Sequence, residues 1–224
     1  MRKSILTSLC IAVFSLFTYG QGLTSIDVAS EKLYMSSDVS KPVNALGSPY
    51  VNKNFLPVKV KGYDDKLFTG RFNAYNGEME INLGTKIIAL DKNKPYEVIY
   101  TQNNKIYRTY NYSTPSGIAK NGFLNVVSET EGYAFLKEEL IKYYDKVPAA
   151  TSYQQDKPAK FKEESPNYYL KKANVIRPFP TKKKDLLKSY PKDAKKIKSF
   201  LKEENISLKK EEDLVKLARY LASL

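Results

Sequence analysis

Short alternations of apolar and polar residues dominate the middle of the chain. Residues 58–61 alternate valine with lysine, and residues 78–83 read Glu-Met-Glu-Ile-Asn-Leu. Such alternation is typical of a strand with one buried face. Turn residues separate these pieces, and Asn76-Gly77 is the strongest hairpin signal among them. Because the links are short, the pattern predicts an antiparallel β body over residues 55–147, arranged as a meander or a curled sheet.

The last part of this body permits two interpretations, and the segment after it has no regular period. Residues 133–147 fit a helical stripe, but they also fit a strand that continues after the turn at Glu131-Gly132, and we favour the strand. Residues 148–166 are rich in Ala, Ser, Gln, Lys, Glu and Pro and offer little to bury. This composition predicts an exposed loop or linker.

The C-terminal part combines one more pair of extended segments with a basic helical tail, together over residues 167–224. From Pro180 onward the period becomes helical, with Thr181 and Ser207 as the expected caps of the first and last helix. The last helix carries an apolar stripe of Leu214, Leu217 and Leu221. The sequence therefore predicts an α+β fold, in which the antiparallel sheet is followed by two to three short helices.

The first twenty residues have the three parts of a secretory signal peptide. A cationic start precedes an apolar run over residues 5–17, and small residues precede a cleavage site before Gln21. The run is shorter than the roughly 20 residues that span a bilayer, and no later segment is apolar enough to do so. We therefore expect cleavage of residues 1–20 and export to the periplasm or the extracellular space. Residues 21–54 have no steady period and predict an irregular lead-in.

The composition closes several routes to catalysis. The chain has no histidine and no tryptophan, and its one cysteine, Cys10, lies in the predicted signal peptide. The mature protein would therefore lack a thiolate nucleophile, an imidazole base and the usual Cys/His metal ligands. It also has no phosphate-binding glycine loop, EF-hand pattern or nucleophile elbow. We assign no catalytic, metal-binding or cofactor-binding residue and expect no cofactor.

The best pair of carboxylates is Glu78 and Glu80, two residues apart on one face of a predicted strand. Paired carboxylates act as acid and base in glycoside hydrolysis, so a glycan hydrolase is one alternative function. We favour a solvated face opposite Met79 and Ile81, because no second acidic cluster supplies a partner.

Tyrosine is abundant, with 18 residues in the chain. Tyr96, Tyr100, Tyr110 and Tyr112 suit either an exposed contact face or one side of a core. We expect the core, since the chain has no tryptophan to fill it.

Positive charge is concentrated in the last third of the chain. Residues 21–150 carry 16 basic and 14 acidic side chains, whereas residues 151–224 carry 19 and 10. Interspersed acidic residues and the predominance of lysine over arginine favour a solvated face, with an anionic glycolipid or surface polymer as the alternative ligand. An exported protein is not expected to bind nucleic acid. The candidate anion contacts are Lys182, Lys183, Lys184, Lys195, Lys196 and Lys198.

The order of several segments resembles that in a group of uncharacterised exported proteins of Bacteroidetes. The start at Gln21 after the signal, the segment 72–81 and the endings 198–208 and 211–217 carry the resemblance, which covers nearly the whole mature chain. The resemblance implies an envelope or secreted location and a β-rich body with a helical tail, but no activity. With the composition, it favours a non-enzymatic binding or scaffolding module whose partner is another envelope protein or an anionic surface polymer.

Overall fold

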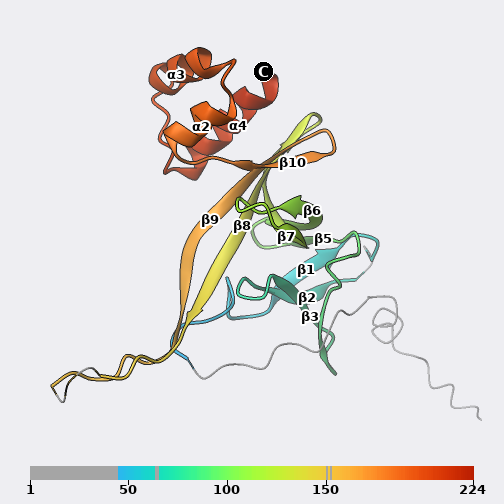
Figure 1. Cartoon of the computed structure of the whole chain (residues 1–224). Coiled ribbons are helices and arrows are strands. Elements are labelled where there is room, and N and C mark those ends of the chain that lie inside the picture. Colours follow the sequence, from blue (N-terminus) through green and yellow to red (C-terminus); the bar gives the residue numbers. More distant parts are fainter. Residues whose placement is uncertain (1–44, 64–65, 150, 152) are drawn as a thin grey trace, which may run out of the picture.

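A computed structural model describes residues 45–63, 66–149, 151 and 153–224. The predicted signal peptide and most of the lead-in lie outside the described residues. Within the described part of the chain, ten antiparallel strands form one sheet, and three short helices follow it (Figure 1). The predicted β-rich body with C-terminal helices is confirmed at this level.

The strands follow one another from Leu56 to Phe179, with a long connection only between β8 and β9, and the helices come after them. The strands are β1 (Leu56–Val60), β2 (Phe68–Asn73), β3 (Glu78–Asn82), β4 (Ile87–Ala89), β5 (Glu97–Tyr100), β6 (Ile106–Ser113), β7 (Ala119–Thr130), β8 (Tyr133–Tyr144), β9 (Lys160–Lys172) and β10 (Val175–Phe179). The helices are α2 (Lys183–Ser189), α3 (Ala194–Glu203) and α4 (Glu211–Ser223).

The strand order departs from a simple meander at one place. The order is β10-β9-β8-β7-β6-β5-β1-β2-β3-β4, so the chain leaves β4 at one edge and returns to pair β5 with β1. In that pairing Val58 lies opposite Tyr100, while on its other side Val58 lies opposite Phe68. Strand β1 is therefore an interior strand, and the face that carries Val58 and Val60 is fully buried in the first hydrophobic core, whereas Lys59 on the other face is exposed.

The sheet bends so that β3 approaches β7, and the first hydrophobic core fills the space between them. The backbone N–H of Ile141 on β8 donates to the carbonyl of Ala74 at 3.4 Å across this closure. Met79, Ile81 and Val98 are fully buried in the core. The face of β1, β2, β3 and β5 that turns toward this core is therefore fully covered.

Strands β8 and β9 are long and serve two further cores. Near the helices, Tyr133 and Phe135 face the helical tail, whereas Leu136 and Tyr169 pack on the opposite face of the sheet. Successive residues of a strand point to opposite faces, so one strand pair supplies both surfaces. Phe135 stacks on Tyr168 with ring centroids 5.2 Å apart.

At their other end β8 and β9 leave the sheet as a projecting arm, which we define as the described residues from Tyr143 to Phe161 (Figure 1). The predicted strand over residues 133–147 is confirmed as far as Tyr144. The predicted loop over residues 148–166 is wrong for its last seven residues, because β9 begins at Lys160. The reason is Phe161, which is buried against Tyr75 and Tyr143 with centroid distances of 5.4 and 5.3 Å.

The end of the lead-in is irregular, as predicted, and lies against the base of the arm. Leu46 exchanges two backbone hydrogen bonds of 2.8 Å with the strand around Lys160. Gly47 follows with a φ of +84°, and a Cβ there would lie 2.6 Å from the carbonyl oxygen of Phe161. Only glycine fits this close crossing without strain.

The helical tail packs on the sheet through its apolar stripes. Leu214, Leu217 and Leu221 are buried in one cluster with Phe135, as their spacing predicts. Glu211 in the first turn of α4 accepts a hydrogen bond from the Tyr168 hydroxyl at 2.8 Å and pairs with Lys137 at 2.7 Å. Both the burial of apolar side chains and the contacts of Glu211 with Tyr168 and Lys137 therefore hold the tail on the sheet.

The expected helix caps are wrong in detail. Lys182 precedes α2 and Lys210 precedes α4, and neither side chain caps its helix. Thr181 and Ser207 lie further out in the connecting turns. In the first turn of α4, the Asp213 carboxylate accepts the backbone N–H of Ser207 at 3.1 Å and so ties the helix to the preceding turn.

Candidate binding cleft and buried carboxylates

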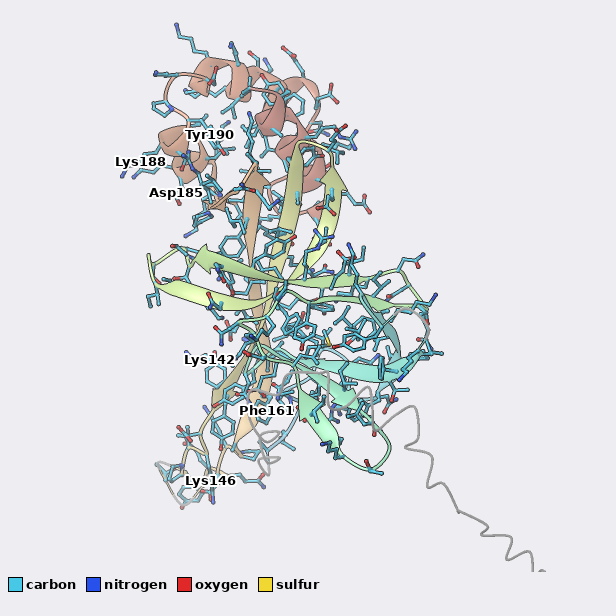
Figure 2. All side chains as sticks on the ribbon, turned by 90° about the vertical axis from the view of Figure 1, so that its right-hand side faces the viewer. Lys142, Lys146, Phe161, Asp185, Lys188 and Tyr190 are labelled. Carbon is cyan, nitrogen blue, oxygen red and sulfur yellow. The ribbon has the colours of Figure 1, made fainter. Side chains whose placement is uncertain are left out.

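An open cleft of about 690 Å³ separates the β9–β10 hairpin from α2. We call it the tail cleft. Figure 2 shows Asp185 and Tyr190 at this helical end of the molecule, whereas Phe161 and Lys146 lie at the opposite end, in the arm. The cleft is lined by Pro115, Pro166, Asn167, Tyr168, Arg177, Pro178, Phe179, Pro180, Thr181, Lys182, Asp185, Ser189 and Tyr190.

The walls of the tail cleft are mostly apolar and rigid. The rings of Tyr168 and Phe179 belong to the buried cluster beneath the helices, and that of Tyr190 packs against the same cluster. Four of the lining residues are prolines, which fix their own φ and present no backbone N–H. The surface is therefore shaped in advance and offers few main-chain donors.

Three charged side chains stand on the walls of this cleft. Arg177 comes from β10, Lys182 precedes α2 and Asp185 lies in its first turn, and all three are exposed. None of them forms an ion pair with another described residue. Burial raises the pKa of the Tyr190 phenol, and the positive charge of Arg177 partly offsets that rise.

Arg71 and Arg108 show how a guanidinium of this chain binds a carboxylate. Arg71 donates from Nε to Glu80 at 2.8 Å, and Arg108 forms ion pairs with Glu97 and Glu129. Both guanidinium groups are held by carboxylates of the chain itself. Arg177 has no such partner among the described residues, so its donors face the cleft and solvent.

The predicted anion contacts do not form one site. Lys182 lines the tail cleft, whereas Lys195 and Lys196 line a shallower groove of about 400 Å³ with Phe200 and Tyr220 on α3 and α4. Lys196 already pairs with Asp193 at 3.1 Å. The other candidates, Lys183, Lys184 and Lys198, are exposed on α2 and α3.

A second constellation of ionisable groups surrounds Glu138 at the β-bulge of β8. Its carboxylate accepts four hydrogen bonds, two on each oxygen, over distances of 2.6 to 2.9 Å. Only 5% of the residue is exposed. The donors are the hydroxyls of Tyr112 and Tyr169, the ammonium of Lys120 and the side-chain amide of Asn167.

The electrostatics of this network keep Glu138 ionised. Burial opposes the charge, but the hydrogen bonds from Asn167, Lys120 and Tyr169 outweigh it and lower the pKa of the carboxyl. Burial and the neighbouring carboxylate raise the pKa of Tyr112 and of Tyr169. Both phenols therefore stay neutral donors at physiological pH, and every acceptor site of the carboxylate is in use.

The expectation of a solvated Glu78–Glu80 face is wrong. Glu80 is fully buried and pairs with Arg71, and Glu78 is only 9% exposed. The cover comes from the end of the lead-in and the residue that follows it, since the Arg71 guanidinium lies 3.6 Å from the ring centroid of Tyr50 and 4.3 Å from that of Phe55. The Arg71–Glu80 ion pair therefore connects the lead-in to the sheet.

The tyrosines are mainly core residues, as expected. Tyr96, Tyr100 and Tyr112 are buried, and Tyr110 is half-buried with its hydroxyl 3.0 Å from Arg108. Tyr96 and Tyr100 belong to the core inside the bent sheet, whereas Tyr112 is buried with Leu136 and Tyr169, and Tyr110 packs against that second cluster.

The described residues contain no group of three or more His, Cys, Asp or Glu side chains that could hold a metal ion. Within the same part of the chain, none of the helices combines the length and hydropathy needed to cross a bilayer. Comparisons with protein-family models, with curated proteins and with solved structures find no match.

Sequence reasoning missed most of the tail cleft. The basic tail of the sequence includes Arg177 and Lys182, with Phe179 and Tyr190 near them, but neither Asp185 nor a shared cleft was predicted, because β10 and α2 come together only through the turn at Pro180. One signal was available: Arg177 is one of only five arginines in a lysine-rich chain and is followed directly by a proline. Glu138 gave no signal of its own, since Lys137, Glu138 and Glu139 look like an exposed charged stretch.

Proposed function

We propose that the protein is an exported, non-enzymatic binding module of the bacterial envelope and that its partner binds in the tail cleft. The observation that carries this proposal is the cleft itself. It joins a rigid apolar wall to three charged groups that have no partner in the described chain. Binding sites typically combine a largely preformed apolar surface with a few polar groups that fix orientation.

The state of the buried ionisable groups supports binding over catalysis. An acid or base catalyst needs a proton-accepting site that a substrate can reach. Glu138 has no acceptor site left, and Glu80 is fully buried behind the lead-in. The alternative of a carboxylate-based glycan hydrolase predicts turnover of envelope glycans, which an assay of reducing-end release measures directly.

A second candidate function is adhesion to an anionic envelope polymer or glycolipid through the basic tail. The exposed lysines favour it, above all Lys195 and Lys196 beside the stacked rings of Phe200 and Tyr220. Replacing Lys195, Lys196 and Lys198 together with Gln would weaken such binding and leave the tail cleft intact.

The proposal can be tested with a fluorophore placed in the cleft, because the chain has no tryptophan. In a Tyr190→Trp variant, the only indole reports on the tail cleft. In a Tyr153→Trp variant, it reports on the fully exposed end of the arm. We expect fractionated envelope peptides or polymers to shift the emission of the first variant and not the second. If no fraction acts on the cleft probe, the cleft is not the binding site.

A further inference from the structure

We propose that the tail cleft recognises the free carboxyl end of a short peptide. The carboxylate pairs with Arg177 and Lys182, while an apolar side chain of the peptide covers Pro178 and the ring of Tyr190. This inference rests on the proposed function of the cleft as a binding site, and it adds the chemistry of the ligand.

The walls of the tail cleft offer few backbone hydrogen-bond donors to a ligand. Pro166, Pro178 and Pro180 remove backbone N–H groups from its walls, so a ligand gains few main-chain hydrogen bonds there. A strand added to β10 is disfavoured for the same reason, since Pro178 interrupts the donors of this edge strand. Recognition must therefore come from the charged side chains and from apolar contact.

The Arg177 guanidinium is complementary in charge to a carboxylate. A guanidinium has a planar fork of donors that fits a carboxylate with two parallel hydrogen bonds. Arg71 and Arg108 are already paired with carboxylates of this chain, and Arg177 is not. Lys182 lines the same cleft and adds a second positive charge. An anionic ligand would supply the missing acceptor.

The charges and the volume of the cleft favour a small ligand with a single negative charge. Asp185 lies in the cleft with the two cations and would repel a densely charged polymer. The volume of about 690 Å³ lies within the range of sites that enclose small ligands, and is too small for a folded domain. The apolar walls require a ligand with an apolar side chain. A short peptide with a free carboxyl end meets these conditions, whereas a polyphosphate or teichoic-type polymer does not.

The experiment compares two forms of one probe peptide on the exported wild-type protein. N-acetyl-Ala-Pro-Phe with a free carboxyl group and the same peptide with a C-terminal amide are titrated by calorimetry. Amide shifts of Phe179, Thr181 and Ser189 in a ¹⁵N-labelled sample locate the binding. We expect the acid to bind in the cleft at least about tenfold more tightly than the amide, because a hydrogen bond to a charged group contributes about 1.5–3 kcal/mol.

Substitutions in the cleft give effects of opposite sign. Arg177→Gln should weaken binding of the acid by about tenfold and reduce the difference between acid and amide to the part that Lys182 contributes. Asp185→Asn should strengthen binding of the same N-acetylated acid, because a repelling charge is lost. Arg219→Gln removes an exposed arginine of α4 and should change neither, as a control for net charge.

Four results would overturn the inference. Equal binding of acid and amide in the cleft would retain the binding site and refute carboxylate recognition. Absence of binding by the acid, with the Tyr190→Trp probe still responding to an envelope fraction, would refute the peptide ligand alone. If inorganic polyphosphate binds the cleft more tightly than the acid does, the ligand is a polyanion instead. Failure of every fraction and probe would refute the proposed function as well.

Discussion

Replacing Glu138 with alanine should destabilise the protein severely, because four donors converge on this one carboxylate. Tyr169 is fully buried and Tyr112 is 6% exposed, so neither hydroxyl can turn to water when its acceptor is removed. A buried donor left without a partner costs about 1–3 kcal/mol. Lys120 contributes less, since 39% of its side chain is exposed and its ammonium can be hydrated.

The expected loss in the free energy of unfolding is therefore about 3–5 kcal/mol, the range seen when one partner of a buried pair is removed. For a chain of this size, that loss lowers Tm by about 10 °C. Urea unfolding followed by far-UV circular dichroism measures it. Glu138→Gln keeps the shape and one acceptor oxygen, so we expect a smaller loss of about 1–2 kcal/mol.

The matched control is Glu131→Ala in the exposed β7–β8 turn, which should change stability by less than about 0.5 kcal/mol. If Glu138→Ala stays within about 1 kcal/mol of the wild type, the network does not hold the bulge, and the reasoning is refuted.

Four other outcomes follow from the described contacts. The pKa of the Glu138 carboxyl is lower in the folded than in the unfolded chain. Its contribution to stability is therefore complete above the ordinary carboxyl pKa of about 4.3 and is lost as pH falls through the lower folded value. A plot of Tm against pH in the acid range should accordingly be less steep for Glu138→Gln than for the wild type. Leu217→Asp should cost about 4 kcal/mol by placing a charge in the buried tail cluster, and an unchanged Tm would mean that the tail is undocked. Gly47→Ala should cost about 2 kcal/mol through its left-handed φ and its contact with Phe161, and normal stability would show that the lead-in adapts. Limited trypsin digestion should cut first after Lys146 in the arm, since Lys157 precedes a proline, and early cuts in α3 would contradict this.

The features that sequence reasoning recovered are those written in local periodicity. The alternation in β3 and the leucine stripe of α4 each repeat over several turns or residues, so one window of sequence contains the whole signal. The strand over residues 133–144 was recovered in the same way, with help from the turn before it.

The features that it missed depend on partners far away in sequence. Glu80 reads as a solvated residue until Tyr50 and Phe55 cover its partner Arg71. The start of β9 depends on Phe161 reaching Tyr75, more than eighty residues earlier. The tail cleft exists only where β10 meets α2. In each case tertiary packing decides the environment, and no single segment encodes it.

The interior place of β1 has a consequence for the order in which the chain emerges. When residues up to β4 have left the ribosome or an export channel, β1 through β4 can pair, but the second edge of β1 stays open until β5 arrives. Val58 and Val60 then lie on an unpaired edge, which is a template for pairing with other chains. The vulnerable period lasts for the synthesis of the segment between Ala89 and Glu97, which is short. Lengthening this connection should increase aggregation during production more than it lowers the stability of the finished fold.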